Sequence, residues 1–313
     1  MRRLILRNFQ SPGDLLMLTA AVRDLHRCHP DQFQTDVRSS CPDFWLNNPW
    51  LTPLEEEAEG VEVIDCQYPL IHRSNQEPWH FIHAFMHDLS DKLGVRITPT
   101  AFRGDLHLSD EEEAAPGPLA DEFPPELPWW LIDAGGKYDY TIKWWSRRRY
   151  QEVVDRLQGR VHFVQIGETG HYHPPLRGVT DLRSRTTLRD LMRLTYHSHG
   201  VLCGVTLLMH LGAAFPPPAD RWSRGGVIIA GGREPVHWEA YPGHQFLHTI
   251  GMLPCCSTGG CWRSRTVPLG DGEPHDEEKH LCKDVVAGLP HCMEMISANE
   301  VVSQIERWLP GED

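Results

Sequence analysis

The sequence predicts an α/β protein with two doubly wound domains, each built on a mainly parallel sheet. Three observations support this prediction. Short apolar runs alternate with stretches of helical spacing along most of the chain. The chain has 313 residues, about twice the usual length of one domain. Residues 109–128, SDEEEAAPGPLADEFPPELP, are acidic and rich in proline, which is typical of a linker. We therefore expect domains at 1–108 and 129–313.

The charge and the hydropathy pattern exclude two classes of protein. The formal net charge of −13 argues against non-specific binding of nucleic acid. No apolar run approaches the roughly 20 residues that a membrane-spanning helix needs. The opening MRRLILRNF is too short and lacks the small-residue cleavage site of a signal peptide, so it is interpreted as a first strand. We expect a cytoplasmic protein, and the sequence leaves open whether it forms a homo-oligomer.

The first half alternates strands with two amphipathic helices. Apolar residues recur at helical spacing from Leu15 to Leu25, and Pro30 ends that run. A second apolar stripe runs from Phe81 to Leu93. The predicted strands lie at 3–7, 34–40 and 60–66, and the predicted helices at 15–30 and 79–95.

The second half repeats this rhythm, and its last helix has a start signal. Ser297 and Glu300 have the spacing of a capping box. Two such domains would place a cleft between the carboxyl ends of two sheets, where open α/β sheets bind ligands. The predicted strands lie at 129–134, 161–167, 200–204 and 225–232, and the predicted helices at 147–157, 187–198, 207–215 and 297–309.

The turn SPGDLLM between the first strand and the first helix contains two candidate residues. Gly13 would let the backbone turn sharply and a ligand approach closely. Asp14 would lie at the helix start, where aspartate is a good N-cap. The same carboxylate could accept a proton from a substrate hydroxyl.

Two further strand ends of the second half carry candidate ligand-binding residues. Lys137 and Lys143 flank the loop GGKYDYTIKWW ahead of a helix, an arrangement that favours a diphosphate site. Gly167 and Glu168 in QIGETG lie where the ribose or base of a nucleotide would bind. The alternatives are a solvated basic loop for the lysines and a surface turn for the glutamate.

The segment VLCGVTLLMHLGAAF places Thr206 near a helix start and His210 one turn further in. A lone histidine on such a helix is more often a hydrogen-bonded core residue than a ligand. Each motif alone is weakly specific, and their order along the chain is more informative.

Three segments, taken in order, resemble family nine glycosyltransferases, the heptosyltransferase-like enzymes. LRNFQSPGDLLMLTAAVRDLHRCHP is similar to their amino-terminal signature. IKWWSRRRYQEVVDRL is similar to their Lys-x-Trp segment, and VTLLMHLGAAF to their Asp-Ser/Thr-Gly-x-x-His-Leu-x-Ala-Ala segment. The resemblance spans nearly the whole chain. It implies a GT-B architecture and inverting transfer of a sugar, a heptose being one candidate, from a nucleotide-sugar donor to a glycan, lipid-linked or protein acceptor.

The resemblance also implies roles for individual residues. Asp14 matches the proposed general base, and Lys143 the lysine that contacts the donor diphosphate. Glu168 falls near the acidic residue that holds the ribose, and Thr206 and His210 match the phosphate-side segment. Lysines and helix amides stabilise a leaving diphosphate without a divalent metal, so none is expected in catalysis.

One departure from the family pattern keeps a second function open. Val205 and Leu207 stand where the family usually has Asp and Gly. This difference could mean another nucleotide sugar, or a non-catalytic protein that binds nucleotide sugars or acts as a scaffold. A Rossmann-type oxidoreductase with a zinc lobe is the third hypothesis, and the missing G-x-G-x-x-G after the first strand argues against it.

The carboxyl-terminal cysteines predict a structural metal site. Nine cysteines cannot all pair in disulfides. Four thiols in two loose pairs suit a tetrahedral zinc or iron. Cys255 could take the place of Cys256 as a ligand, and His275, His280 or His291 could replace one thiol. The expected ligands are Cys256, Cys261, Cys282 and Cys292. The remaining thiols are treated as small apolar core residues, namely Cys28, Cys41, Cys66 and Cys203.

The segment between these cysteines supports the metal hypothesis. RSRTVPLGDGEPHDEEKHL, residues 263–281, is polar and has little to bury. Metal binding can supply folding free energy on the order of 10 kcal/mol, so a clamp would let such a segment fold. GGCWRSR also resembles the Cys-Trp of the four-cysteine iron finger in bacterial autotransporter heptosyltransferases, with different spacing.

Overall fold

The computed structural model describes residues 1–121, 123–124, 126–217 and 224–309. The chain divides into two compact units. The first unit comprises Met1–Ala115 with Ala213–Phe215, and the second comprises Pro116–Gly212 with Pro216–Asp313. Each unit contains a parallel sheet and helices, so the predicted α/β class is confirmed.

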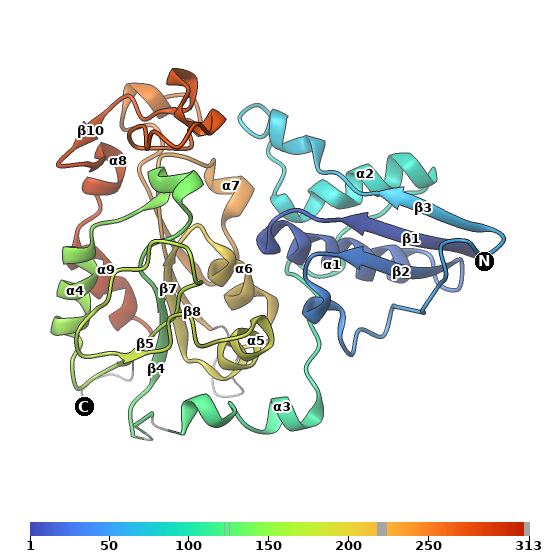
Figure 1. The fold of residues 1–313 in the computed structure, drawn as a ribbon, viewed down its shortest axis with the longest axis horizontal. Coiled ribbons are helices and arrows are strands. Elements are labelled where there is room, and N and C mark those ends of the chain that lie inside the picture. Colours follow the sequence, from blue (N-terminus) through green and yellow to red (C-terminus); the bar gives the residue numbers. More distant parts are fainter. Residues whose placement is uncertain (122, 125, 218–223, 310–313) are drawn as a thin grey trace. The chain divides into compact units, whose positions relative to one another are not determined.

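The first unit has a three-stranded parallel sheet in the order β2-β1-β3 (Figure 1). The three predicted strands and both predicted helices are present. The second helix starts later than the apolar pattern indicated, because a single 3-10 turn at Phe81–His83 precedes it. The elements are β1 Arg2–Asn8, α1 Pro12–Cys28, β2 Phe33–Ser39, β3 Val61–Asp65 and α2 Ala84–Leu93.

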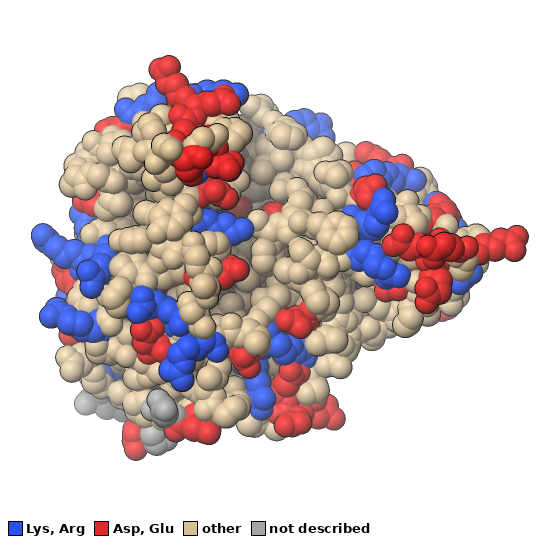
Figure 2. Space-filling view, in the orientation of Figure 1, with Lys and Arg blue, Asp and Glu red and all other residues tan. Residues whose placement is uncertain are grey.

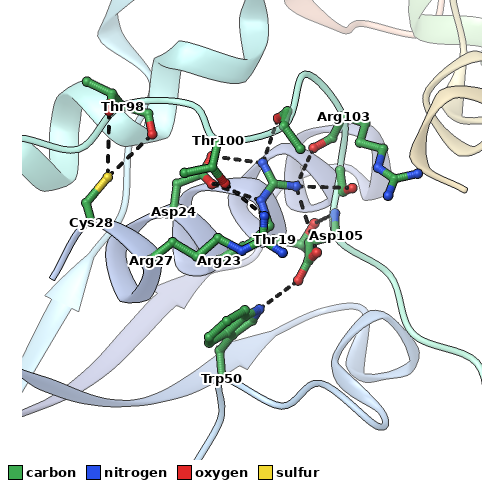
Figure 3. Close-up of polar contacts among 12 residues, drawn as sticks. Thr19, Arg23, Asp24, Arg27, Cys28, Trp50, Thr98, Thr100, Arg103 and Asp105 are labelled. Atoms are coloured by element: carbon green, nitrogen blue, oxygen red, sulfur yellow. Dashed lines mark hydrogen bonds and ion pairs between the residues drawn. The ribbon is translucent and has the colours of Figure 1, made fainter. Parts of the chain in front are cut away.

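A buried ion pair on α1 holds the chain that follows α2. Arg23 donates to the carboxylate of Asp24 at 2.8 Å, and both side chains are almost fully buried. The same guanidinium donates to the carbonyl oxygens of Ala101 at 2.7 Å and Arg103 at 2.8 Å (Figure 3). Removing one partner of such a pair costs about 3–5 kcal/mol, because the other charge stays buried. The pair therefore ties the end of the first unit to α1.

The stretch 109–128, interpreted as a linker, contains a short helix that the sequence analysis did not predict. Helix α3, Asp110–Ala114, begins with a capping box between Ser109 and Glu112. None of its residues is buried, in keeping with the acidic composition. A single 3-10 turn follows at Pro118–Ala120.

The second unit is built on a six-stranded, fully parallel sheet in the order β6-β5-β4-β7-β8-β9. Counted along the chain, this is the 3-2-1-4-5-6 order of Rossmann folds. The four predicted strands are confirmed, whereas β6 and β9 were not predicted. The strands are β4 Trp129–Asp133, β5 His162–Gln165, β6 Thr180–Asp181, β7 Gly200–Gly204, β8 Gly225–Gly231 and β9 His244–His248.

Helices cover both faces of this sheet. Figure 1 shows α4 and α9 on one side and α5 and α6 on the other. Ser297 caps α9 by accepting a hydrogen bond from the backbone N–H of Glu300, as the capping spacing predicted. The helices are α4 Arg147–Arg156, α5 Leu188–His197, α6 Leu207–Ala214, α7 Val236–Glu239, α8 His291–Glu294 and α9 Ala298–Glu306.

The indole of Trp130 packs across the middle of the sheet. Trp130 on β4 pairs with Gly200 on β7, which in turn pairs with Gly225 on β8. A Cβ atom at Gly200 would lie 2.4 Å from the indole, and one at Gly225 would lie 2.7 Å from it. Both glycines are therefore needed for the fully buried ring to fit.

Charges of both signs are spread over the face of the molecule in Figure 2. Acidic side chains gather at the top of this view, over residues 271–278. Within the described ranges, no helix combines the length and the apolar character needed to cross a membrane.

The polar segment 263–282 folds around the guanidinium of Arg265. This side chain is fully buried, and its Nη1 and Nη2 each donate to the Asp271 carboxylate at 2.7 Å. Nη1 also donates to Asp276 at 2.5 Å. Asp276 in turn accepts backbone N–H groups of Leu269 and Gly270. This segment, which has few apolar residues, thus surrounds a buried guanidinium with two aspartates that stay partly exposed.

We predict that Arg265→Met loosens this segment selectively. The substitution removes the donors that hold Asp271 and Asp276, so hydrogen exchange of the Leu269 and Gly270 amides should become at least about ten-fold faster, the effect of losing one charge-assisted hydrogen bond. Arg156→Met, on the exposed side of α4, is the control and should leave these amides unchanged. Equal exchange in the two variants would contradict an organising role for Arg265.

The ion pair between Arg265 and Asp271 also makes the fold of this segment sensitive to acid. The hydrogen bond from Arg265 lowers the pKa of Asp271 to about 2. A lowered carboxyl pKa stabilises the folded state above the ordinary value of about 4, and the contribution is lost as the pH falls through the folded value. The Leu269 and Gly270 amides should therefore keep their protection from pH 7 down to pH 4 and lose it towards pH 2.

Candidate functional site

The candidate site lies at the carboxyl ends of β4 and β7, where the strand order of the second unit reverses. Ligands of open α/β sheets bind in the crevice at such a switch point. Asp133 ends β4, and Thr206 lies between the end of β7 and the start of α6. Thr206 Oγ1 donates to Asp133 Oδ2 at 3.0 Å. The structure thus places one predicted donor-binding residue, Thr206, at the switch point.

A histidine completes this polar cluster. His173 Nδ1 lies 3.1 Å from Asp133 Oδ1, and both side chains are more than nine-tenths buried. Neither ring nitrogen of His173 has a well-aligned hydrogen-bond partner among the described residues. The imidazole packs on Gly167, where a Cβ atom would lie 2.5 Å from the ring. The predicted residue Gly167 therefore serves the cluster by leaving room for His173.

The ammonium of Lys143 is held at the same edge by a buried carboxylate. Lys143 Nζ lies 2.7 Å from Glu234 Oε1 and donates to the carbonyl oxygen of Val205 at 3.1 Å. Glu234 follows the end of β8, and its side chain is 1% exposed. Arg233 donates to the same Oε1 atom. Two cations thus share one carboxylate oxygen directly beside the end of β7.

The charges around Glu234 keep it ionised. Burial opposes ionisation of this carboxyl, but the charges and hydrogen bonds of Arg233 and Lys143 outweigh burial and lower its pKa below the ordinary value. The ring of Tyr140 faces both cations, 5.6 Å from Lys143 Nζ and 4.9 Å from the guanidinium carbon of Arg233. Glu234, Arg233 and Lys143 together therefore have a net charge of +1, and the Asp133 carboxylate lies at the same edge of the sheet.

The loop that leads to Lys143 is fixed by its neighbours. Gly135, after β4, has φ +148°, and a Cβ atom there would lie 1.8 Å from the carbonyl oxygen of Tyr172. Gly136 and Tyr172 exchange backbone hydrogen bonds. Closer to the lysine, Ile142 N–H donates to the carbonyl oxygen of Ser264 at 3.2 Å. Hydrogen bonds to the loop after β5 and to Ser264 in the segment 255–292 therefore hold this loop in place.

Two predicted donor-binding residues lie in more exposed positions. Lys137 is half-buried and lies immediately before the 3-10 stretch Tyr138–Lys143. The Glu168 side chain is 72% exposed, in a turn beside His171. This position fits the surface-turn alternative as well as a ribose contact, and the ribose role stays a prediction.

His210 is engaged inside the second unit. On α6, its Nδ1 lies 2.8 Å from the hydroxyl of Tyr241, and its Nε2 lies 3.7 Å from Glu239. The residue is 5% exposed. These contacts match the hydrogen-bonded core histidine that was the alternative to a ligand-binding role.

In the first unit, Gly13 and Asp14 lie in the first turn of α1. Ser11 is the N-cap, and its backbone N–H donates to Asp14 Oδ2 at 3.1 Å in a capping box. The expectation that Gly13 makes a sharp turn is wrong, because Pro12 already starts the helix and Gly13 has no positive φ. Asp14 was expected at the N-cap itself, but Ser11 holds that position and Asp14 supports the cap from three residues further on.

All nine cysteines lie within the described ranges, and none of them is in a disulfide. Cys41, Cys66 and Cys203 are buried as expected, whereas Cys28 is only half-buried. Of the two adjacent cysteines in the cluster, Cys256 is buried. Its thiol faces the carbonyl oxygens of Thr249 and Leu253 at 3.5 Å.

Four other thiols of the cluster lie within electrostatic reach of one another. Burial and, in smaller part, the charges of Cys261, Cys282 and Cys255 raise the pKa of Cys292 to about 12. Cys282 Sγ donates to the carbonyl oxygen of Asp284 at 3.2 Å. In the part of the chain that the structure describes, no three His, Cys, Asp or Glu side chains are arranged closely enough to hold a metal.

A surface cavity of about 610 Å³ lies along α4 and contains none of the predicted site residues. Basic side chains gather at the left edge of Figure 2, where Figure 1 shows α4. The cavity is lined by Arg147, Arg148, Gln151, Glu152, Asp155, Arg156 and Arg177.

Four residues of the switch-point edge were not predicted from the sequence: Asp133, His173, Arg233 and Glu234. Asp133 could have been found, because it ends the predicted strand WWLIDA at the edge where ligands bind. Arg233 and Glu234 directly follow the predicted strand GGVIIAGG, for the same reason. His173 had no such signal, since it lies six residues beyond the predicted end of β5.

No protein-family model and no curated protein sequence matches the chain. Several solved structures do match. A family 9 glycosyl transferase from Veillonella parvula is 12% identical, with a TM-score of 0.66 over 98% of this chain and 97% of that chain. The iron-containing dodecameric glycosyltransferase TibC from enterotoxigenic E. coli is 16% identical, with a TM-score of 0.61 over 98% and 76%.

The E. coli heptosyltransferase WaaC, solved with ADP, is 13% identical, with a TM-score of 0.51 over 97% of both chains. At these identities the comparisons establish the fold. Over nearly its whole length, the chain has the fold of family 9 glycosyltransferases and heptosyltransferases, as its sequence motifs predicted.

Proposed function

We propose that the chain is an inverting glycosyltransferase that moves a sugar from a nucleoside-diphosphate sugar to an acceptor hydroxyl. One observation carries this proposal: Lys143 and Thr206, which resemble donor-binding motif residues, lie at the switch point of a Rossmann-ordered sheet. The similarity of the fold to heptosyltransferases adds support. Because WaaC was solved with ADP, ADP is the first nucleotide to test and an ADP-heptose the first donor.

The charges at the site suit a diphosphate leaving group. Negative charge grows on the leaving phosphate as the glycosidic bond breaks. Lys143 supplies a positive charge, and α6 begins directly after Thr206, so its first N–H groups and its dipole also favour an anion. A catalytic divalent metal is not needed in this scheme.

Asp14 is the proposed general base. It would take the proton of the acceptor hydroxyl while that oxygen bonds to the anomeric carbon and the nucleoside diphosphate leaves from the opposite face. Asp14 belongs to the first unit and Lys143 to the second, so the reaction requires both units to act on one substrate.

Lys143→Met should weaken binding of ADP by roughly 10- to 100-fold, the effect of losing a hydrogen bond to a charged group. Isothermal titration calorimetry measures this change. Lys279→Met, at an exposed lysine paired with Glu277, is the control and should bind like the wild type. Unchanged affinity in Lys143→Met would remove the diphosphate role of this lysine.

Asp14→Asn should slow transfer about 10²- to 10⁴-fold while ADP affinity and fold are kept. Asparagine can still accept the Ser11 N–H, so the helix cap survives. Ser11→Ala is the matched control, because it removes the Ser11 hydroxyl of the capping box and keeps the Asp14 carboxylate. It should lower the free energy of unfolding by about 0.5–2 kcal/mol and leave the rate of transfer unchanged. Wild-type transfer by Asp14→Asn would show that Asp14 is not the base.

The second candidate, a non-catalytic protein that binds nucleotide sugars, is an outcome of the same assays. It is supported by the capping role of Asp14 and by Val205 at the position of the usual family acid. A wild-type protein that binds ADP and ADP-heptose but forms no glycoside with any acceptor of the panel would favour it.

We further propose that the thiols of the carboxyl-terminal cluster hold a structural zinc or iron. The thiols of Cys255, Cys261, Cys282 and Cys292 lie near one another, and four cysteine sulfurs are a ligand set that suits either metal. The proposal takes Cys255 as the fourth ligand because its charge acts on both Cys261 and Cys292, whereas the thiol of Cys256 faces two backbone carbonyl oxygens. TibC is described as iron-containing.

Elemental analysis of protein purified without chelator should find about one equivalent of zinc plus iron. Cys255→Ser should lower this content several-fold, whereas Cys256→Ser should keep it. The melting temperature provides a second measurement, since a chelator should lower it in the wild type. Metal-free wild-type protein that melts at the same temperature with and without chelator would rule out the site.

A further inference from the structure

Glu234 connects three parts of the second unit. Its Oε1 atom accepts from Lys143 and from Arg233, and the side chain is 1% exposed. Arg233 is itself held from the other side, because its Nε donates to the carbonyl oxygen of Arg263 at 2.6 Å and its guanidinium lies over the ring of Trp262. The carboxylate is therefore placed between the ammonium of a long lysine side chain and a guanidinium that other residues hold in place.

We propose that Glu234 is a positioning residue that holds the Lys143 ammonium at the switch point before an anionic ligand binds. Lysine has a long flexible stem, and ordering it costs side-chain entropy. Contacts to Glu234 and to the Val205 carbonyl oxygen use two of the three N–H donors of the ammonium. The remaining donor is available to a phosphate oxygen.

The charge balance supports positioning over simple stabilisation. A buried ion pair often adds little net stability, because removing both charges from water offsets their attraction. A carboxylate that met Lys143 alone would cancel its charge and weaken its attraction for an anion. Arg233 neutralises Glu234, so Lys143 is held in place while the cluster keeps a local charge of +1. Arg233 cannot take the role of Lys143, because Arg263, Trp262 and Tyr140 fix its guanidinium.

This inference deepens the proposed function, and its first test needs no ligand. The charged and aromatic groups around the ammonium are Glu234, Arg233 and Tyr140. In Glu234→Gln the ammonium would lose the carboxylate that holds it, so the Lys143 amine should spend more time free of its contacts. Acylation of this amine at pH 8, measured by mass spectrometry, should become about ten-fold faster, the effect of losing one hydrogen bond between charged groups.

Two variants test whether the effect is specific. Glu234→Asp keeps the charge and should restore most of the wild-type acylation profile. Glu294→Gln removes a carboxylate that pairs with Arg149 elsewhere in the unit, and it should leave Lys143 unchanged. Identical acylation of Lys143 in the wild type and Glu234→Gln from pH 7 to pH 10 would overturn the proposal.

A double-mutant cycle on ADP affinity provides the second test. Glu234→Gln should weaken ADP binding in the wild-type background and have little further effect in the Lys143→Met background. Equal losses in both backgrounds would mean that Glu234 does not act through Lys143. If the wild type binds no nucleoside diphosphate, the proposed function fails and the acylation result alone decides the role of Glu234.

Discussion

The shared carboxylate of Glu234 is the interaction on which the ligand-facing edge of the second unit depends. It lies after β8 and receives Lys143 from the loop after β4 and Arg233 from its own loop. The lysine in turn donates to the carbonyl oxygen of Val205, the residue directly after β7. Three neighbouring strands thus meet through one buried charge. Such an arrangement is stable only if all its members are present, because an unpaired charge in this position is costly.

The segment 255–292, which contains the clustered cysteines, contributes to the same edge of the sheet. Ser264 and Thr266 make backbone and side-chain hydrogen bonds to Ile142 and Thr141, directly before Lys143. Any metal bound by this segment would therefore lie outside the proposed reaction and still influence where Lys143 lies. The guanidinium of Arg265 organises the loop between the cysteines. Ion pairs therefore help to fold a segment for which the sequence had indicated only a metal.

The fold was predictable to the extent that each element had a local signal. Helix α1 has a regular apolar stripe, and β4 and β8 are buried runs bounded by turn residues. Strand β6 has only two residues and β9 is partly exposed, so neither had a pattern to detect. The site depends more on tertiary structure. Glu234 directly follows a predicted strand, but no local pattern shows that it meets Lys143, and only the folding of the sheet brings the two together.

The packing of Trp130 across Gly200 and Gly225 has a consequence for the alignment of the sheet. A shift of β7 by one residue against β4 would place Val201 or His199 opposite Trp130. Neither side chain would fit there, because the indole leaves no space for a Cβ atom at this position. The indole therefore fits only one register of β4, β7 and β8, and it excludes registers shifted by one residue. The ends of β4, β7 and β8, more than 9 Å further along the chain by the rise of a strand, inherit their alignment from this one ring.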